Sequence, residues 1–546
     1  MTNAKNLAGR AVGRLLGLPP HTCDHDVIRG LRVPMRDGAE LIADHYRPVT
    51  PKPAGTLLVR TPYGRGYPVS ALFGSVYANR GYHVVVQSVR GTYGSGGEFS
   101  PFANEVADGA DTAAWLRDQP WFTGAFATIG ASYFGFTQWA LLTDPPDEMA
   151  AAVITAGPHD LSGPRWGTGS FGLNDFLGWC DDVVHQEEPG RIRGIARMLT
   201  ARRRIARATA GLPVGEAGRT LLGEDARWYE EWLEHPEYDD EFWSPTRLHA
   251  ALEKAEVPVL LLSGWQDIFI EQTLQQYAQL RGRDVPVAMT VGSWTHAQML
   301  NLGAPTVLRD SLEWLDAHLA NDGHGSGRRS VRVKVNHDGW LELDDWPPQM
   351  PEQVRYLQPG GRLGDAVPPD TAPASTFTYD PTDPTPTIGG RLLSPVSGYR
   401  RDDKLAERTD VLTFTGDTLS QDLYVVGNPV LELAHSCDNP HNDLFVRVSE
   451  VDAKGRSRNV SDGYLRGTTE SGTITIVLDA VAHKFRAGSR IRVLIAGGSH
   501  PRFARNLGTG EPLRTGTRLR PATHTVHLGD GASRLRLPAG RRPSSH

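Results

Sequence analysis

The sequence predicts an α/β fold with a doubly wound sheet, followed by an all-β domain. Up to about residue 330, short β-branched runs alternate with helical patterns, as they do when helices cover both faces of a parallel sheet. One run, residues 125–129, passes through Gly130 to Ser132 and into a helical pattern at 133–142. Beyond about residue 330, short alternating strands are separated by glycine, proline and aspartate, which is typical of a β-sandwich.

The elements of the first domain follow from local patterns taken in chain order. Residues 31–46 alternate around the turn signal Arg36-Asp-Gly38, which predicts an antiparallel hairpin. Apolar, β-branched runs predict buried parallel strands at residues 56–59, 83–86, 125–129, 151–155, 257–262 and 285–291. Helical patterns occupy residues 69–80, 105–117, 133–142 and 305–321.

Changes of pattern divide the chain further. Residues 161–250 hold helical patterns, several tryptophans and no convincing strand, so we predict a helical cap inserted into the first domain. The α/β domain then comprises residues 1–160 and 251–325, and residues 326–546 form the β-sandwich. Candidate strands of the sandwich are residues 331–335, 375–379, 411–415, 421–426, 444–448, 473–478 and 490–495.

Composition argues against several classes of protein. The net charge of −6 gives no general attraction to nucleic acid or to anionic membranes. Only Cys23, Cys180 and Cys437 occur, so neither a disulfide framework nor a paired metal motif is expected, and a reducing compartment is the default. Arg10 and Arg14 interrupt the apolar residues near the N-terminus, and no run is long enough to span a bilayer. We expect a cytoplasmic protein that needs no metal or other cofactor.

Ser132 is the first candidate for chemistry. A strand, a bend of small residues and a helix would lift its hydroxyl above the edge of the sheet. A serine nucleophile needs a base to accept its proton and a carboxylate to orient that base. In doubly wound sheets these groups come from the ends of later strands, first the acid and then the histidine. Asp267 follows the predicted strand 257–262 and His296 follows the strand 285–291, so we predict a Ser132, Asp267 and His296 triad.

Each of these residues also has a purely structural interpretation. Ser132 can be a buried turn serine, Asp267 a turn or capping residue, and His296 a polar loop residue. Three such residues at strand ends favour one catalytic site over three coincidences. His159 also follows a strand end, but it precedes the acid and is interpreted as a packing residue. The sequence shows no zinc helix motif and no plausible metal cluster.

Acyl transfer also needs hydrogen-bond donors for the oxyanion. The backbone N–H of Tyr133 is placed by the bend itself, and a second donor is expected from the loop at residues 60–65. Pro62 has no N–H, so the phenol of Tyr63 is the better candidate, although its ring can also pack beneath the loop. The glycine-rich segment 90–97 lacks the lysine and the spacing of a phosphate-binding loop and is interpreted as structural.

Several segments of the chain form a recognisable set. They are Thr61-Pro-Tyr-Gly64, Arg90-Gly91, Gly130-Ala-Ser-Tyr-Phe-Gly135, Gly264-Trp-Gln-Asp267, Gly292-Ser-Trp-Thr-His296, Tyr379-Asp-Pro381, Gly389-Gly390 and Pro501-Arg-Phe-Ala-Arg-Asn506. Together they resemble the cocaine esterase and X-prolyl dipeptidyl-peptidase family of serine hydrolases. The elbow of that family reads Gly-x-Ser-Tyr-x-Gly, which accounts for a glycine at position 135 instead of 134.

The resemblance implies an α/β-hydrolase domain, an inserted helical cap and a C-terminal jelly roll. It also implies Ser132, Asp267 and His296 as the triad, with the Tyr63 hydroxyl and the Tyr133 N–H as oxyanion donors. Family members that act on α-amino acid esters carry acidic residues directly after the triad aspartate.

This chain has Ile268-Phe269 at that position, so an apolar acyl pocket is expected. Phe269 and the cap residues Trp166 and Trp179 are candidate walls, and packing within the cap is an equal alternative for both tryptophans.

The sequence as a whole predicts a serine hydrolase that cleaves acyl or aryl carboxylic esters through an acyl-enzyme. Alternatives are acyl transfer from the same intermediate and an X-prolyl dipeptidyl aminopeptidase. The aminopeptidase would use acidic cap residues, otherwise solvated, to anchor a free N-terminus: Glu230, Glu231, Asp239 and Asp240. A catalytically silent protein that binds carbohydrate or a partner through its sandwich is the alternative from another class. The expected partner is a small-molecule ester or amide, with no nucleic acid or membrane, and a homo-oligomer is compatible with the sequence.

Overall fold

The structure is a computed structural model that describes residues 13–188, 191–320, 329–467 and 472–543. The molecule divides into two compact units. The first unit comprises residues up to 161 together with 241–264 and 272–331. The second unit comprises residues 162–240, 265–271 and 332–546.

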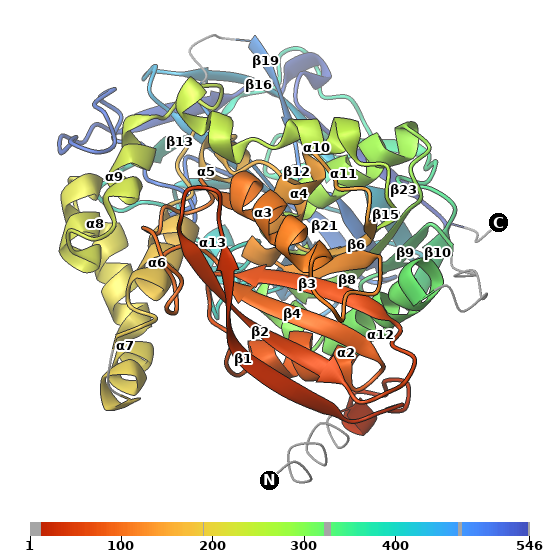
Figure 1. Ribbon diagram of the computed structural model, residues 1–546. Helices are drawn as coiled ribbons and strands as arrows, with labels where there is room; N and C mark the ends of the chain where they lie inside the picture. The colour runs from red at the N-terminus through yellow and green to blue at the C-terminus, as the bar shows by residue number, and fades with distance from the viewer. Residues whose placement is uncertain (1–12, 189–190, 321–328, 468–471, 544–546) are drawn as a thin grey trace. The chain divides into compact units, whose positions relative to one another are not determined.

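The first unit is built on a sheet whose strands follow the spatial order β1-β2-β4-β3-β5-β6-β7-β8 (Figure 1). The strands are β1 (His25–Pro34), β2 (Glu40–Pro48), β3 (Gly55–Thr61), β4 (Tyr82–Ser88), β5 (Phe126–Ala131), β6 (Met149–Thr155), β7 (Val259–Gln266) and β8 (Val287–Thr295). β1 and β2 form the expected antiparallel hairpin, whereas β4-β3-β5-β6-β7 pair in parallel. Every residue of β3, β4 and β5 is buried, as the continuous apolar runs indicate. The doubly wound α/β prediction is confirmed.

Helices connect these strands. They are η1 (Ser70–Ser75), α2 (Val76–Ala78), α3 (Glu105–Arg117), α4 (Tyr133–Leu142), η2 (Glu241–Thr246), α10 (His249–Lys254), α11 (Ile270–Gly282), η3 (Ala297–Leu300), α12 (Ala304–Leu315) and η4 (Asp316–Ala320). α3 and α4 have the predicted bounds. The helix predicted at 305–321 is divided between α12 and η4, and its last residue lies outside the described residues.

Between β6 and β7, the described residues form helices and no β-strand. Besides η2 and α10, these are α5 (Ser162–Trp166), α6 (Leu173–Val184), α7 (Arg191–Ala210), α8 (Val214–Leu222) and α9 (Arg227–Glu234). The segment 162–240 that contains α5 to α9 groups with the second unit. Among the helices that the structure describes, none combines the length and apolarity that crossing a membrane requires.

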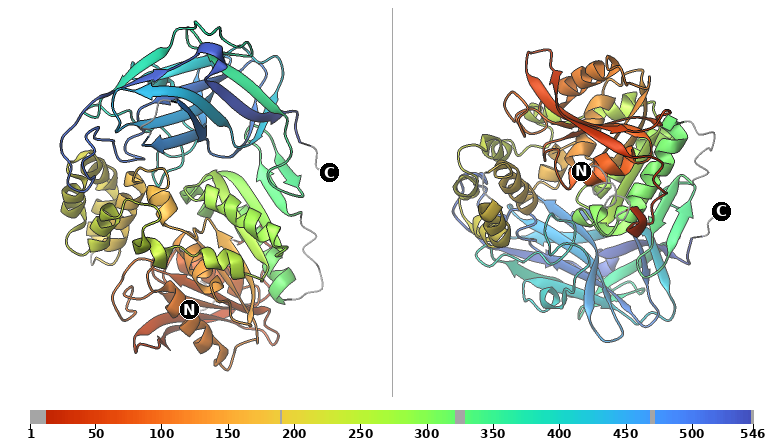
Figure 2. Two further views of the ribbon diagram at one scale, coloured as in Figure 1. Left: turned by 90° about the horizontal axis from the view of Figure 1, so that it is seen from above. Right: turned by 60° about the horizontal axis from the view of Figure 1, so that its bottom comes forward.

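The rest of the second unit is almost entirely β-structure, drawn in green to blue in Figure 2. Its strands are β9 (Val331–Lys334), β10 (Trp340–Leu343), β11 (Glu352–Gln358), β12 (Arg362–Gly364), β13 (Ser375–Tyr379), β14 (Val411–Gly416), β15 (Leu423–Gly427), β16 (Val430–Cys437), β17 (Asp443–Val451), β18 (Ser457–Arg466), β19 (Gly472–Val477), β20 (Val481–Phe485), β21 (Arg490–Ala496), β22 (Ala522–Val526) and β23 (Arg534–Gly540). The short helices α13 (Asp403–Ala406) and η5 (Gly529–Gly531) accompany them.

Alternating apolar residues form the core of this β-region. Leu431 and Leu433 of β16 pack in one cluster with Leu444, Val446 and Val448 of β17. Within each strand these residues are two positions apart, so they lie on the same face. β17 pairs antiparallel with both β18 and β21, so it is an inner strand of the sheet. The predicted C-terminal all-β domain is confirmed.

Candidate functional site

Ser132 occupies the sharp turn between β5 and α4. Its backbone has φ +60° and ψ −119°, a conformation that is strained for any residue other than glycine. The Ser132 N–H donates to Thr155 O at 2.9 Å, which ties the turn to β6. The Gly135 N–H donates to Ser132 O at 2.8 Å and starts the helix. This geometry is that of a nucleophile elbow, and it leaves Ser132 half-buried at the carboxyl end of a central strand.

Two glycines of the motif are required by close packing. A Cβ at Gly130 would lie 2.3 Å from the Cβ of Phe134, so only glycine lets the strand bend back against the helix. A Cβ at Gly135 would lie 2.4 Å from the Cα of Gly157, which follows the end of β6. The glycine is therefore needed at position 135, because that residue faces the neighbouring backbone.

The two candidate oxyanion donors lie beside the elbow. Tyr133 is the first residue of α4, where backbone N–H groups favour negative charge. Tyr63 lies in the loop after β3, with its ring 5.6 Å from the ring of Phe134 and 6.5 Å from that of Tyr133, edge to face. The Tyr63 side chain is half-buried, and its N–H donates to the Thr61 hydroxyl at 3.0 Å. The structure brings Tyr63, Tyr133 and Ser132 together in the first unit.

The glycine-rich segment 90–97 supports the Tyr63 loop. A Cβ at Gly64 would lie 2.8 Å from the ring of Tyr93, so this ring packs directly on the loop backbone. Arg65 donates to Tyr93 O at 3.1 Å. These contacts within the protein agree with the structural interpretation of the segment.

His296 directly follows β8 and precedes η3. It is half-buried and lies in the first unit with Ser132. Close packing joins the ends of β7 and β8 here, since a Cβ at Gly264 would lie 2.3 Å from Trp294 O. A Cβ at Gly292 would also meet the Trp294 ring at 2.4 Å. The glycines of both motifs thus accommodate Trp294, two residues before His296.

Asp267 directly follows β7 and is fully buried. It lies in the short segment Trp265–Glu271, which groups with the second unit. In that unit the Trp265 indole N–H donates to Lys334 O at 2.8 Å, and its ring lies 5.2 Å from that of Trp346. Glu271 Oε1 accepts from the Ala480 N–H at 3.3 Å. The acid-bearing segment is therefore anchored at both of its ends by contacts within the second unit.

The three candidate pocket residues also lie in the second unit. Phe269 is buried, two residues after Asp267. The Trp166 indole N–H donates to Trp232 O at 2.9 Å, and the half-buried Trp179 stacks on the Trp232 ring at 6.2 Å. Both tryptophans thus belong to an aromatic cluster of the helical segment 162–240, and Trp166 also lines a cavity of about 670 Å³.

Burial weakens His159 as an alternative base. It is fully buried, and desolvation together with the nearby His249 lowers its pKa to about 4. An imidazole with so low a pKa is a poor proton acceptor near neutral pH. This agrees with the interpretation of His159 as a packing residue.

Sequence reasoning missed one cluster of side chains, in the described part of the chain, whose types can bind a metal ion. The cluster consists of His337, Glu450 and His483. The Nε2 atoms of His337 and His483 lie 3.3 Å and 3.1 Å from Glu450 Oε2. Arg486 donates to His337 Nδ1 at 2.9 Å, so that nitrogen holds the lone pair and Nε2 holds the proton. This pattern favours hydrogen bonds to the carboxylate over coordination of a metal. The three residues are far apart in sequence, so no short motif could reveal them.

Two family models match this chain. Residues 37–298 match the X-Pro dipeptidyl-peptidase (S15 family), and residues 325–535 match the X-Pro dipeptidyl-peptidase C-terminal non-catalytic domain. The chain belongs to the cocaine esterase and X-prolyl dipeptidyl-peptidase family. The family resemblance of its motifs is thereby confirmed, and the protein is an enzyme of a hydrolase family.

Proteins similar to this family member carry names that indicate different activities. The cocaine esterase of Rhodococcus sp. (strain MB1 Bresler) is 27% identical in a match that covers 89% of this chain and 93% of that protein. An aminopeptidase from the marine sediment archaeon Thaumarchaeota archaeon gives a TM-score of 0.81 at 24% identity, covering 96% and 97% of the two chains. An α-amino acid ester hydrolase gives a TM-score of 0.81 at 21% identity, covering 96% and 98%. These two solved structures show the shared fold alone.

Proposed function

We propose that this family member is a serine hydrolase that cleaves acyl or aryl carboxylic esters through an acyl-enzyme intermediate. Ser132 is the proposed nucleophile, His296 the general base and Asp267 the residue that orients His296. The observation that carries the proposal is the strained backbone of Ser132, with φ +60°, at the end of a central strand. Such strain persists when the surrounding structure over-determines it, and it concentrates at active sites.

The proposed reaction has two steps. Ser132 Oγ attacks the ester carbonyl carbon as His296 accepts the hydroxyl proton, and the carbonyl oxygen becomes an oxyanion held by the Tyr63 hydroxyl and the Tyr133 N–H. The tetrahedral intermediate collapses, and His296 returns the proton to the departing alcohol. Water then attacks the acyl-enzyme and gives a proton to His296, which passes it to Ser132 Oγ as the carboxylic acid leaves.

Local chemistry after Asp267 favours an ester over a substrate with a free ammonium group. Ile268 and the buried Phe269 present no charge there, so an apolar acyl group suits the position better. A cationic N-terminus would need an unpaired carboxylate, since a buried cation without a partner is costly.

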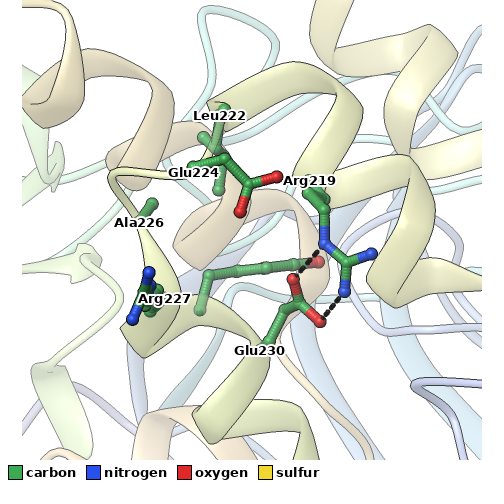
Figure 3. Close-up of a pocket in the computed structure, with 8 residues that line it drawn as sticks. Arg219, Leu222, Glu224, Ala226, Arg227 and Glu230 are labelled. Atoms are coloured by element: carbon green, nitrogen blue, oxygen red, sulfur yellow. Dashed lines mark hydrogen bonds and ion pairs between the residues drawn. The ribbon is translucent and has the colours of Figure 1, made fainter.

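The acidic residues considered as anchors for such an N-terminus are either already paired or exposed to water. Glu230 already pairs with Arg219 at 2.6 Å and with Arg514 at 3.0 Å, and the adjacent cavity of about 10 Å³ holds no more than a water molecule (Figure 3). Asp240 pairs with His235 at 2.8 Å. Glu231 and Asp239 are exposed, where water screens a charge. The X-prolyl aminopeptidase therefore remains the second candidate, supported by the family model that matches residues 37–298.

Two measurements test the proposed function. Incubation with a fluorophosphonate should give one covalent adduct, mapped to Ser132 by peptide mass spectrometry, and Ser132→Ala should abolish it. Absence of an adduct would favour a binding protein instead. Turnover of p-nitrophenyl esters should then exceed turnover of an X-proline p-nitroanilide, and equal or faster cleavage of the anilide would make the peptidase the better proposal.

A further inference from the structure

We infer that Glu105 is a positioning residue that fixes both parts of the proposed oxyanion-binding site. It lies at the start of α3 and contacts no proposed reacting atom. Its carboxylate joins the residue that follows the nucleophile to the strand end that leads into the Tyr63 loop. The inference rests on the proposed function, because an oxyanion site has a role only if acyl transfer takes place.

The first contact of Glu105 is with Tyr133. The Tyr133 hydroxyl donates to Glu105 Oε1 at 2.7 Å and accepts from the Phe102 N–H at 2.9 Å. The Phe102 ring also stacks on the Tyr133 ring at 4.2 Å. Phe102 has φ +70°, a strained conformation that directs its N–H to the tyrosine oxygen. Tyr133 is buried, and its ring and hydroxyl are both held by neighbours. These contacts therefore also restrict the Tyr133 backbone.

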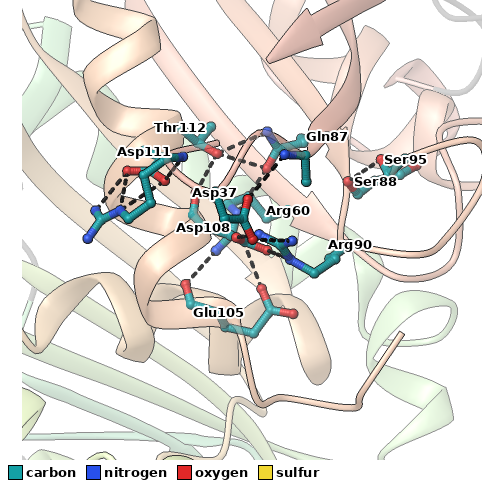
Figure 4. Close-up of polar contacts among 12 residues, drawn as sticks. Asp37, Arg60, Gln87, Ser88, Arg90, Ser95, Glu105, Asp108, Asp111 and Thr112 are labelled. Carbon is teal, nitrogen blue, oxygen red and sulfur yellow. Dashed lines mark hydrogen bonds and ion pairs between the residues drawn. The ribbon is translucent and has the colours of Figure 1, made fainter. Parts of the chain in front are cut away.

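The second contact of Glu105 is with Arg60, near the end of β3. Arg60 Nη2 lies 2.9 Å from Glu105 Oε2, and Arg60 Nη1 donates to the Glu105 backbone O at 2.9 Å (Figure 4). Arg60 Nε donates to Gln87 Oε1 at 3.0 Å, so its guanidinium has partners on β4 and α3. Tyr63 is three residues after Arg60. The carboxylate thus holds the strand end from which the Tyr63 loop leaves.

A third contact joins the two parts directly. The Thr137 hydroxyl on α4 shares its one proton between the Phe134 backbone O at 2.9 Å and the Arg60 backbone O at 3.3 Å. A closed circuit therefore runs from Tyr133 through Glu105 and Arg60 to α4. Movement of Tyr133, or of the strand end at Arg60 from which the Tyr63 loop leaves, would break at least one buried polar contact, and such a loss is costly where water cannot replace it.

Opposing effects act on the ionisation of the Glu105 carboxyl. Burial raises the pKa of the Glu105 carboxyl, and the Arg60 guanidinium and the Tyr133 hydroxyl act in the opposite direction. Asp108, one turn later on α3, also raises the pKa of Glu105. A neutral amide at position 105 would turn an N–H group toward either Arg60 or Tyr133, and the circuit would lose one of its two contacts.

Asp108 provides a matched control. It is also buried, lies on the same helix and pairs with an arginine, since Arg90 Nη2 lies 2.6 Å from its carboxylate. It has no contact with Tyr133 among those that define the circuit. Asp108→Asn therefore changes a buried, arginine-paired carboxyl on the same helix and leaves the Glu105 contacts in place.

The experiment compares Glu105→Gln, Tyr133→Phe, the double variant and Asp108→Asn in the full-length protein, with a p-nitrophenyl ester as substrate. We expect Glu105→Gln to lower kcat about 10-fold to 100-fold with KM nearly unchanged, as misplacement of a catalytic group does. Tyr133→Phe should lower kcat similarly, and the double variant should lose no more than either single one. Affinity for a boronic acid, which mimics the tetrahedral oxyanion, should fall by the same factor as kcat.

The outcomes separate this inference from the proposed function. If Asp108→Asn lowers kcat as much as Glu105→Gln, or if Glu105→Gln keeps wild-type kcat, Glu105 has only a structural role. If Glu105→Gln fails to fold, Tyr133→Phe decides: a lowered kcat at unchanged KM supports the inference, and wild-type kcat overturns it. A wild-type protein without a fluorophosphonate adduct at Ser132 would overturn the proposed function, and the inference with it.

Discussion

The elbow that carries Ser132 and the segment that carries Asp267 are held by different physical means. The elbow depends on shape, because Gly135 lies against Gly157 with no room for a Cβ and the turn is fixed by backbone hydrogen bonds. The segment Trp265–Glu271 depends on side chains of the second unit, namely an indole hydrogen bond at one end and charges at the other.

Arg391 is the centre of the charged contacts at the acid-bearing segment. Its Nη1 lies 3.4 Å from Glu271, and its Nη2 pairs closely with Asp479. Burial by itself lowers the pKa of Arg391, but the carboxylates of Asp479, Glu271 and Asp267 contribute to raising it overall. Asp267 is therefore within electrostatic reach of this arginine.

This difference has a consequence for the proposed triad. The nucleophile needs only the first unit for its local geometry, since the contacts of the elbow lie within that unit. The proposed acid needs the second unit, which anchors its segment. We therefore expect changes at the elbow to act through packing and changes near Asp267 to act through charge.

The largest effect is expected at the acid. Asp267→Asn should lower kcat by about 10⁴, because an amide would stabilise the wrong tautomer of His296. Steady-state kinetics on a p-nitrophenyl ester would measure this loss. Glu271→Gln is the matched control in the same segment, and it should cost far less because Glu271 is half-exposed. An Asp267→Asn enzyme with a tenth or more of wild-type kcat would remove Asp267 from the triad.

The next-largest loss of kcat is expected at Tyr63, beside the elbow. Tyr63→Phe should lower kcat by about 10²–10³, the usual loss when one oxyanion donor is removed. The ring remains, so its packing against Phe134 is retained and stability should change little. Tyr93→Phe, in the loop packed on Gly64, controls for the loss of a nearby phenol. An unchanged kcat for Tyr63→Phe would leave the packing role as the better explanation.

Packing at the elbow itself is tested by Gly135→Ala. The added Cβ would lie 2.4 Å from Gly157 Cα, so the turn must shift, and the free energy of unfolding should fall by about 1–3 kcal/mol. A shift of the nucleophile should also lower kcat by about tenfold or more. Gly282→Ala at the end of α11 meets nothing within 4 Å and should retain both stability and activity. Denaturant unfolding and kinetics would measure both quantities, and a Gly135→Ala protein equal to Gly282→Ala would show that the elbow has room to relax.

The same contrast explains which features the sequence could predict. The elbow is a local motif, so its strand, turn and helix follow from neighbouring residues, and α4 has its predicted bounds. The sequence could not show why position 135 must be glycine, because the pairing of β5 with β6 is what brings Gly157 against it. The membership of Asp267 in a segment held by the second unit was hidden for the same reason, since its contacts are distant in sequence.

Long-range polar contacts also concealed strands of the β-region. β18 reads as polar, with Asn459, Ser461 and Asp462 among its residues, and alternation alone gives no strand there. In the structure all three are buried because distant partners satisfy them. Arg447 binds Asp462 at 2.7 Å, and the Ser461 hydroxyl donates to Asp479 O at 2.6 Å. Tertiary contacts thus override the local pattern, which explains why the prediction omitted this strand.

The smallest effect is expected from the charges near Asp267, and it appears as a pH dependence of stability. Burial raises the pKa of Asp479 from 3.8 to about 6, against the opposing effect of Arg391 and Arg502. Between about pH 4 and pH 6 the folded protein therefore binds a proton that the unfolded chain has lost. The resulting contribution to stability is complete below pH 3.8 and is lost as the pH rises through about 6, and it amounts to at most about 3 kcal/mol.

Asp479→Asn should remove this contribution and flatten the slope of the unfolding free energy between pH 4 and pH 6, measured by denaturant unfolding at several pH values. Asp338→Asn is the control, because hydrogen bonds from the Gly339 N–H and Arg542 outweigh burial and lower the pKa of Asp338, which places its titration below this window. A wild-type slope retained in Asp479→Asn would show that Arg391 keeps Asp479 ionised throughout. In that case the anchor of the acid-bearing segment would be as insensitive to pH as the packing of the elbow.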